Sequence, residues 1–202
     1  MPALMQSALP LDLVRGGLAR GALPESLGAL LIGLQLGLLL LLQWPVGRAL
    51  ARRPVALGLT VSFLGFAAGC LLLALSAVVP AGVVVLILAQ LPLALGTASF
   101  LPTATEAMVE LTPVEHQGLA MALYSQCFAI SAFGAPLLAG RLLDSQGHGV
   151  GLWLLMAAVA LLGLVPVRWV ERYQRRNVIR AITASDPDGG QDILYRFDDS
   201  GD

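Results

Sequence analysis

The chain has 202 residues, of which 57% are hydrophobic and 12% are charged, with a formal net charge of −1 and a mean hydropathy of +0.80. A soluble domain of average composition carries about 25% charged residues, because its surface helices need a polar face. The composition therefore excludes an ordinary soluble domain. All twelve basic residues are Arg, which favours a GC-rich bacterial genome.

Residues 1–14 are apolar but are interrupted by Pro2, Pro10 and Asp12. They lack the basic leader and the unbroken apolar core of a signal peptide, so we expect them to form the last turns of a spanning helix whose beginning is missing. Five longer apolar stretches follow, each close to the roughly 20 residues that a helix needs to cross a bilayer. They cover residues 26–46, 55–78, 83–105, 119–143 and 149–167.

This pattern predicts an all-α membrane protein: a bundle of five full transmembrane helices plus a short N-terminal helix remnant, within residues 1–170. Residues 171–202 are polar, so we expect a disordered tail. The loop after the first full stretch and residues 168–180 after the last hold eight Arg residues, against three on the opposite side. Because cytoplasmic loops carry an excess of basic residues, we expect the C-terminus in the cytoplasm and the bundle in a bacterial inner membrane.

Features typical of soluble enzymes are missing from the sequence. It has no Ser-His-Asp set, no phosphate-binding Gly loop and no cluster of His and Cys residues. We therefore expect no enzyme activity, no cofactor, no metal ion and no nucleic-acid partner. Two glycine pairs, Gly33 with Gly37 and Gly65 with Gly69, have the small-xxx-small spacing that lets helix backbones approach closely, so we expect both to serve helix packing.

Polar side chains inside the apolar stretches are informative, because burying them in hydrocarbon is costly unless they pair or face water. Three stretches carry them at spacings that place several on one side of a helix, whereas 55–78 and 149–167 are much poorer. We expect the three polar stretches to surround a cavity and the other two to face lipid. Interhelical hydrogen bonding is an equally good explanation for any single residue. The candidate solute-binding residues are Gln35, Gln90, Thr97, Tyr124 and Gln126.

Glu106 is the first charged residue after Arg53, and it lies at the end of the third full stretch. A buried carboxylate there could carry a proton and couple transport to a proton gradient. A carboxylate at the membrane interface would simply be solvated, and we favour this interpretation. Pro92 and Pro102, in the same stretch, each remove a backbone hydrogen bond and predict kinks in this helix.

Three motifs follow one another in the chain. Residues 47–54 form a Gly- and Arg-rich loop, residues 110–121 read Glu-Leu-Thr-Pro-Val-Glu-His-Gln-Gly-Leu-Ala-Met, and residues 134–144 form a Gly- and Pro-rich helix. In this order they resemble the second half of the major facilitator superfamily, over about residues 8–170. The gating and structural positions that the resemblance implies are Gly47, Arg48, Arg52, Arg53, Gly134, Pro136 and Gly140.

The resemblance implies alternating access between two six-helix halves. It also implies that the three polar stretches are the family's eighth, tenth and eleventh helices, which line its central cavity. We therefore expect a permease that moves a small-molecule solute by secondary active, proton-coupled transport, in the direction of efflux. Its expected partners are the lipid bilayer, the solute, and a second transporter half or a second copy of the chain. The alternative is a non-transporting integral membrane protein, either a truncated remnant or an assembly factor.

Overall fold

The structure is a computed structural model that describes residues 2–172, with side chains described from residue 7 onward. The chain divides into two units, Met1–Leu164 and Val165–Asp202. The described residues of the second unit, 165–172, are helical. The predicted disordered tail lies outside the described residues from position 173 onward.

The described part of the first unit is helical throughout, apart from its connections. A single turn of 3-10 helix, Val114–His116, precedes the fifth helix. The α-helices are α1 (Pro2–Arg15), α2 (Glu25–Leu50), α3 (Val55–Val78), α4 (Gly82–Leu111), α5 (Gln117–Gln146) and α6 (Val150–Leu162).

Five helices are long and apolar enough to cross a membrane, and they confirm the predicted fold class. Three of them are α2, α3 and α4, the fourth contains α5 (Val114–Gln146), and the fifth begins with α6 (Val150–Arg172). The helix α1 is the short N-terminal one, because its 14 residues extend about 21 Å, less than the roughly 30 Å of a hydrocarbon core.

Prolines and one glycine set several helix ends. Pro24 and Pro54 immediately precede α2 and α3, where a missing backbone N–H costs nothing. Gly147 ends α5 in the left-handed conformation, with φ of +72°, which glycine adopts without strain. The helix α4 continues from Gly82 to Leu111 through both of its internal prolines.

Close packing of α3 on α4 forms the centre of the unit. A Cβ atom added to Gly65 would lie 2.8 Å from the carbonyl oxygen of Pro92 and 3.0 Å from the Cα atom of Gly96. Gly69 lies directly against the side chain of Leu93. The glycine pair on α3 therefore packs as expected.

The expectation for the glycine pair on α2 was wrong. No atom comes within 4 Å of a Cβ placed at Gly33 or Gly37, so this face of α2 is open.

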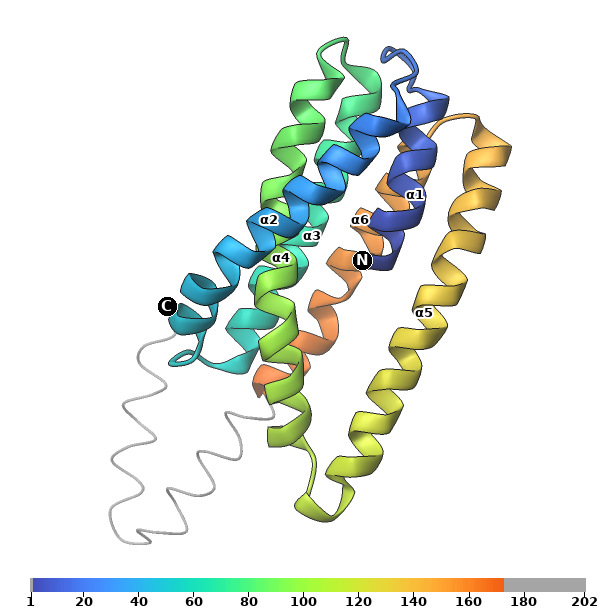
Figure 1. The fold of residues 1–202 in the computed structure, drawn as a ribbon. Coiled ribbons are helices and arrows are strands. Elements are labelled where there is room, and N and C mark those ends of the chain that lie inside the picture. The colour runs from blue at the N-terminus through green and yellow to red at the C-terminus, as the bar shows by residue number, and fades with distance from the viewer. Residues whose placement is uncertain (1, 173–202) are drawn as a thin grey trace, which may run out of the picture. The chain divides into compact units, whose positions relative to one another are not determined.

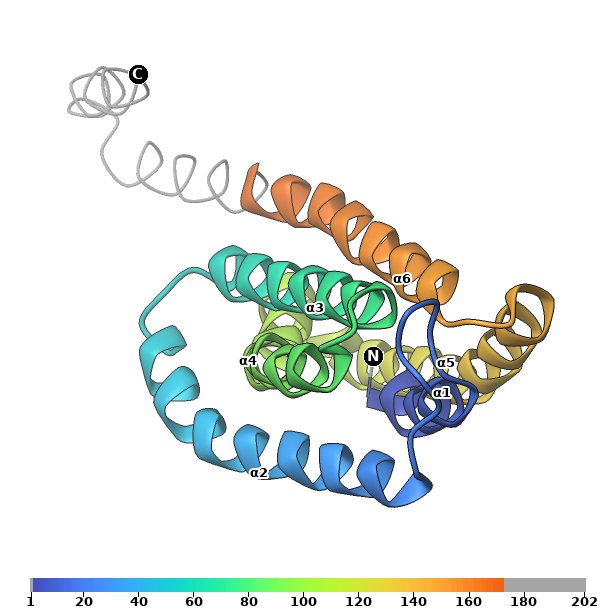
Figure 2. The same ribbon diagram turned by 90° about the horizontal axis from the view of Figure 1, so that it is seen from above.

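Four helices form a row in which α2 packs on α4, α4 on α3, and α3 on α6 (Figure 2). The helix α1 lies beside α5 and also contacts α2 (Figure 1). The buried core draws on α1 to α6, and its largest fully buried apolar side chains are Leu9, Leu13, Leu31, Leu73, Leu86, Leu93, Leu143, Leu152 and Trp153.

Burial differs strongly among the spans. The share of buried residues in an 18-residue apolar stretch of each span is 56% in α3 and 50% in α4. It is only 17% in α2, and no residue of the stretch in α5 is buried. The expected lipid-facing helix α3 is thus the most buried, because it lies between α4 and α6. It still presents an outward apolar stripe at a seven-residue period, as a lipid-facing surface requires. The stripe consists of Leu57, Leu64, Leu71 and Val78.

Candidate functional site

Two of the five candidate solute-binding residues are buried inside the bundle, both on α4. The Nε2 atom of Gln90 donates to the carbonyl oxygen of Leu86 at 3.0 Å, and the hydroxyl of Thr97 donates to that of Leu93 at 2.9 Å. The Oε1 atom of Gln90 is buried and has no hydrogen-bond partner among the described residues. An unpaired buried acceptor costs about 1–3 kcal/mol, so Gln90 can gain a hydrogen bond from a polar group that enters the bundle.

The other three candidates lie on outer surfaces of the two least buried spans. Gln35 on α2 and Tyr124 on α5 are half-buried, and Gln126 on α5 is exposed. Within the described part of the chain, none of these three side chains forms a hydrogen bond to protein. The five candidates therefore do not share one surface: two lie in the interior, and three are free to contact whatever covers α2 and α5.

The N-terminal half of α5 stands out because residues 117–134 include no buried side chain. Its exposed apolar residues, such as Ile130 and Phe133, lie among polar ones, such as Tyr124 and Gln126, that form no hydrogen bond to the described residues. If lipid surrounded this helix on all sides, each unpaired polar side chain would cost free energy in hydrocarbon. This mixed surface is typical of a helix that contacts other protein or lines a water-filled path.

Glu106 is exposed on α4, five residues before the helix ends at Leu111. The turn before it is different, because Thr103 is buried and its hydroxyl donates to the carbonyl oxygen of Ser99 at 2.6 Å. The carboxylate of Glu106 thus lies outside the packed interior of the unit.

The motif predicted as a loop is only partly a loop, because residues 47–50 form the last turn of α2 and residues 51–54 connect it to α3; together they form a cationic surface at this end of α2. Arg48, Arg52 and Arg53 are exposed and surround a hollow of about 440 Å³. The guanidinium of Arg48 lies 5.7 Å from the centre of the Trp44 ring, within cation–π range. Among the described residues, none of the three arginines forms an ion pair. Gly47, at the base of the motif, has open space around it.

The predicted Gly- and Pro-rich motif lies in the second half of α5. Open space surrounds Gly134 and Gly140, since no atom comes within 4 Å of an added Cβ. Pro136 is exposed, and the helix continues through it. None of these residues is a close packing position in the described unit.

A buried polar network joins distant segments at one end of the bundle, and sequence reasoning missed it. Asp12 and Arg20 are 0% and 4% exposed, and Arg20 Nη2 lies 3.2 Å from Asp12 Oδ2. Arg20 Nη1 donates to the hydroxyl of Ser76 at 3.0 Å, and Trp153 Nε1 donates to Asp12 Oδ2 at 3.3 Å. The network ties α1, the α1–α2 connection, α3 and α6 together. The available signal was an acidic residue within an apolar helix, which calls for a buried partner.

The same network reaches two helix starts. The Oδ1 atom of Asp12 lies directly against Gly149, the residue before α6, where the partial positive charge of the helix N-terminus favours a carboxylate. The aliphatic stem of Arg20 lies against Gly82, the first residue of α4, because an added Cβ there would lie 3.0 Å from Arg20 Cδ. Two glycines therefore make room for this ion pair.

These features define an integral membrane protein made of helices, with polar side chains on its two least buried spans. The family model described as Major Facilitator Superfamily matches residues 5–187, and the chain belongs to this superfamily of membrane transporters. No curated protein and no solved structure matches the chain significantly.

Proposed function

We propose that the chain forms part of a permease that moves a small solute by secondary active, proton-coupled transport in the direction of efflux. The observation that carries the proposal is the combination of polarity and exposure on α2 and α5. These spans hold Gln35, Tyr124 and Gln126, and they are 17% and 0% buried over their apolar stretches. The exposed faces of α2 and α5 are proposed to line the solute path.

We infer that another protein segment covers these faces of α2 and α5, because their polar side chains would be unfavourable in lipid. An amide or hydroxyl without a hydrogen-bond partner costs several kcal/mol in hydrocarbon. The proposed cover is a second transporter half, supplied by another chain or by a second copy of this one. In the complete assembly, Gln90 and Thr97 join the path when α4 shifts against α2, and Gly134, Pro136 and Gly140 allow α5 to move.

Glu106 is proposed as the proton-coupling residue, because it lies near the end of the same helix that carries Gln90 and Thr97, and a second half that covers its exposed carboxylate would desolvate it. Arg48, Arg52 and Arg53 are proposed as the gating loop, where three unpaired cations can form and break contacts with a partner half. Gly47, which has open space around it, leaves room for the partner half to approach this loop.

The purified full chain, reconstituted into liposomes with a pH gradient, tests the transport proposal. Solute-dependent proton flux is measured against a panel of small solutes, together with the mass of the reconstituted particle. We expect flux from an assembly of two halves and none from a monomer, because alternating access needs both halves. Replacing Gln126 by Ala should lower the flux up to about tenfold, since it removes one hydrogen bond to solute without disturbing packing.

Two further variants give this experiment its controls. Ala158→Leu, at an exposed position on α6, should leave the flux unchanged. Glu106→Gln should abolish proton movement while solute exchange persists. Robust flux from a monomer would refute the requirement for a second half. Absence of flux from every assembly and every solute would instead favour a non-transporting membrane protein.

The proposed location is a bacterial inner membrane with the C-terminus in the cytoplasm, from the eight-to-three distribution of Arg. A reporter enzyme that works only in the cytoplasm, fused after Asp202, should be active. A matched fusion in the turn between α3 and α4, at Ala81, should be inactive. The reverse pattern would overturn the orientation.

A further inference from the structure

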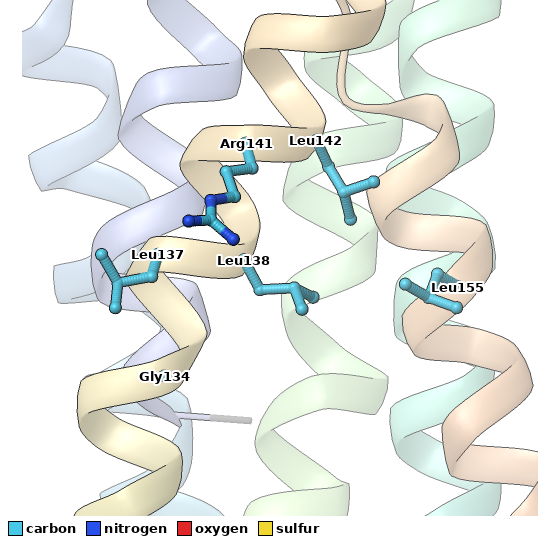
Figure 3. Close-up of a pocket in the computed structure, with 6 residues that line it drawn as sticks. All are labelled: Gly134, Leu137, Leu138, Arg141, Leu142 and Leu155. Carbon is cyan, nitrogen blue, oxygen red and sulfur yellow. The ribbon is translucent and has the colours of Figure 1, made fainter.

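A groove between α5 and α6 combines apolar walls with one unpaired cation. Its volume is about 380 Å³. Figure 3 shows Leu138 and Leu142 of α5 pointing toward Leu155 of α6, while the guanidinium of Arg141 extends along α5 toward Leu137. Gly134 continues the groove along α5 without a side chain, and no protein atom comes within 4 Å of its added Cβ position.

The charge of Arg141 is not neutralised by protein in the described part of the chain. The nearest carboxylate along the helix is Asp144, and its Oδ1 atom is already in an ion pair with Arg15 of α1. Arg141 forms no hydrogen bond or ion pair within the described residues. The guanidinium beside this groove therefore remains available to an anion, for which its planar fork offers two parallel hydrogen bonds.

The depth of Arg141 selects the kind of anion. The 30 residues of α5 extend about 45 Å, which matches a whole bilayer of about 40–45 Å with headgroups. The backbone of Arg141 is five residues from the end of α5 and so lies about 7 Å below it, at the boundary between headgroups and hydrocarbon. Its guanidinium extends one turn deeper in the structure, and the long side chain reaches the headgroup level when it turns toward the helix end. Leu155 is five residues from the start of α6, at the same depth. Gly134 lies about 10 Å deeper than Arg141.

We propose that this groove binds one anionic phospholipid, with its phosphate on the guanidinium of Arg141 and an acyl chain along Leu138, Leu142 and Leu155. Leu142 and Leu155 wall the groove at the depth of Arg141, and the groove continues deeper past Leu138 to Gly134, so that a cation near the headgroups is joined to an apolar trough, as an anionic amphiphile requires. Basic pockets between transmembrane helices bind acidic lipid headgroups for the same reason, and in the proposed orientation this groove lies in the leaflet away from the cytoplasm. The proposal requires that the side of α5 next to α6 stays open to lipid when a second half covers the rest of α5, and it is independent of transport activity.

Fluorescence quenching beside the groove tests the proposal in the full chain. Val159→Cys on α6, one turn beyond Leu155, carries a bimane label. Cys127 is exposed and is replaced by Ser, whereas Cys70 is buried and stays. Vesicles contain phosphatidylcholine with increasing fractions of chain-brominated phosphatidylglycerol or chain-brominated phosphatidylcholine. We expect the anionic lipid to quench at about tenfold lower mole fraction, as one charge-assisted bidentate contact implies.

Three variants separate the headgroup contact from the acyl-chain contact. Arg141→Gln should remove the preference for the anionic lipid, and Arg141→Lys should retain part of it. Gly134→Leu fills the groove without meeting protein atoms, so it should reduce quenching by both lipids while circular dichroism stays unchanged. Arg53→Gln, which removes the same charge from the α2–α3 loop, should leave the preference intact. Equal quenching by both lipids in the parent chain would overturn the proposal, and so would an equal loss in Arg53→Gln.

Discussion

Replacing Arg20 by Met is expected to lower the free energy of unfolding by about 3–5 kcal/mol, because it leaves the Asp12 carboxylate buried without its counter-charge. Asp12 is fully buried and its Oδ2 atom accepts from both Arg20 Nη2 and Trp153 Nε1. Loss of the guanidinium also leaves the hydroxyl of Ser76 without its donor. Unfolding in mixed detergent, followed by circular dichroism, measures the change.

A surface pair and a double variant control this prediction. Arg15→Gln breaks the ion pair between Arg15 and Asp144, whose side chains are 36% and 68% exposed, respectively. Because this pair is solvated, the variant should lower the free energy of unfolding by less than about 1 kcal/mol. Replacing both Asp12 by Leu and Arg20 by Met should recover most of the lost stability, since no uncompensated charge remains. If Arg20→Met cost no more than Arg15→Gln, the network would not hold this end of the bundle.

Gly65→Leu is expected to separate α3 from α4 and to destabilise the unit by about 1–3 kcal/mol or more. The added Cβ would lie 2.8 Å from the carbonyl oxygen of Pro92 and 3.0 Å from Gly96 Cα, and these backbone atoms cannot move without moving the whole helix. Thermal unfolding in detergent, monitored by circular dichroism, gives the change in stability.

The matched control is Gly33→Leu on α2, where no atom lies within 4 Å of the added Cβ. This variant should be neutral or slightly stabilising in the isolated chain, because Gly is about 1 kcal/mol less favourable than Ala in a helix. Equal losses from Gly65→Leu and Gly33→Leu would show that close approach of α3 and α4 does not limit stability.

Much of the fold could be predicted from local pattern. Helix type and span number depend on the length of each apolar run compared with the thickness of a bilayer, and both quantities can be read along the chain. The order of the motifs at residues 47–54, 110–121 and 134–144 was sufficient to indicate the superfamily that the family match established. The pair Gly65 and Gly69 was correctly expected to pack, since it lies in a span rich in small residues.

The rotation of each helix about its axis could not be predicted in the same way. Membrane spans are apolar on every side, so the sequence pattern contains little information about which face meets a neighbour. For this reason Gln90 and Thr97 were grouped with Gln35 and Gln126, although two are buried and the others are not. Gly33 was expected to pack for the same reason, although its surface is open.

By itself, the sequence determined that this protein is a helical membrane protein with five spans and the motif order of one superfamily, because these properties are local or sequential. The tertiary structure alone decided which surfaces are buried. It brings Asp12 to Arg20 and to Trp153, which is 141 positions away, it brings Arg20 to Ser76, and it leaves α5 almost uncovered. Such contacts arise from the packing of several helices at once, which no periodicity within one helix encodes.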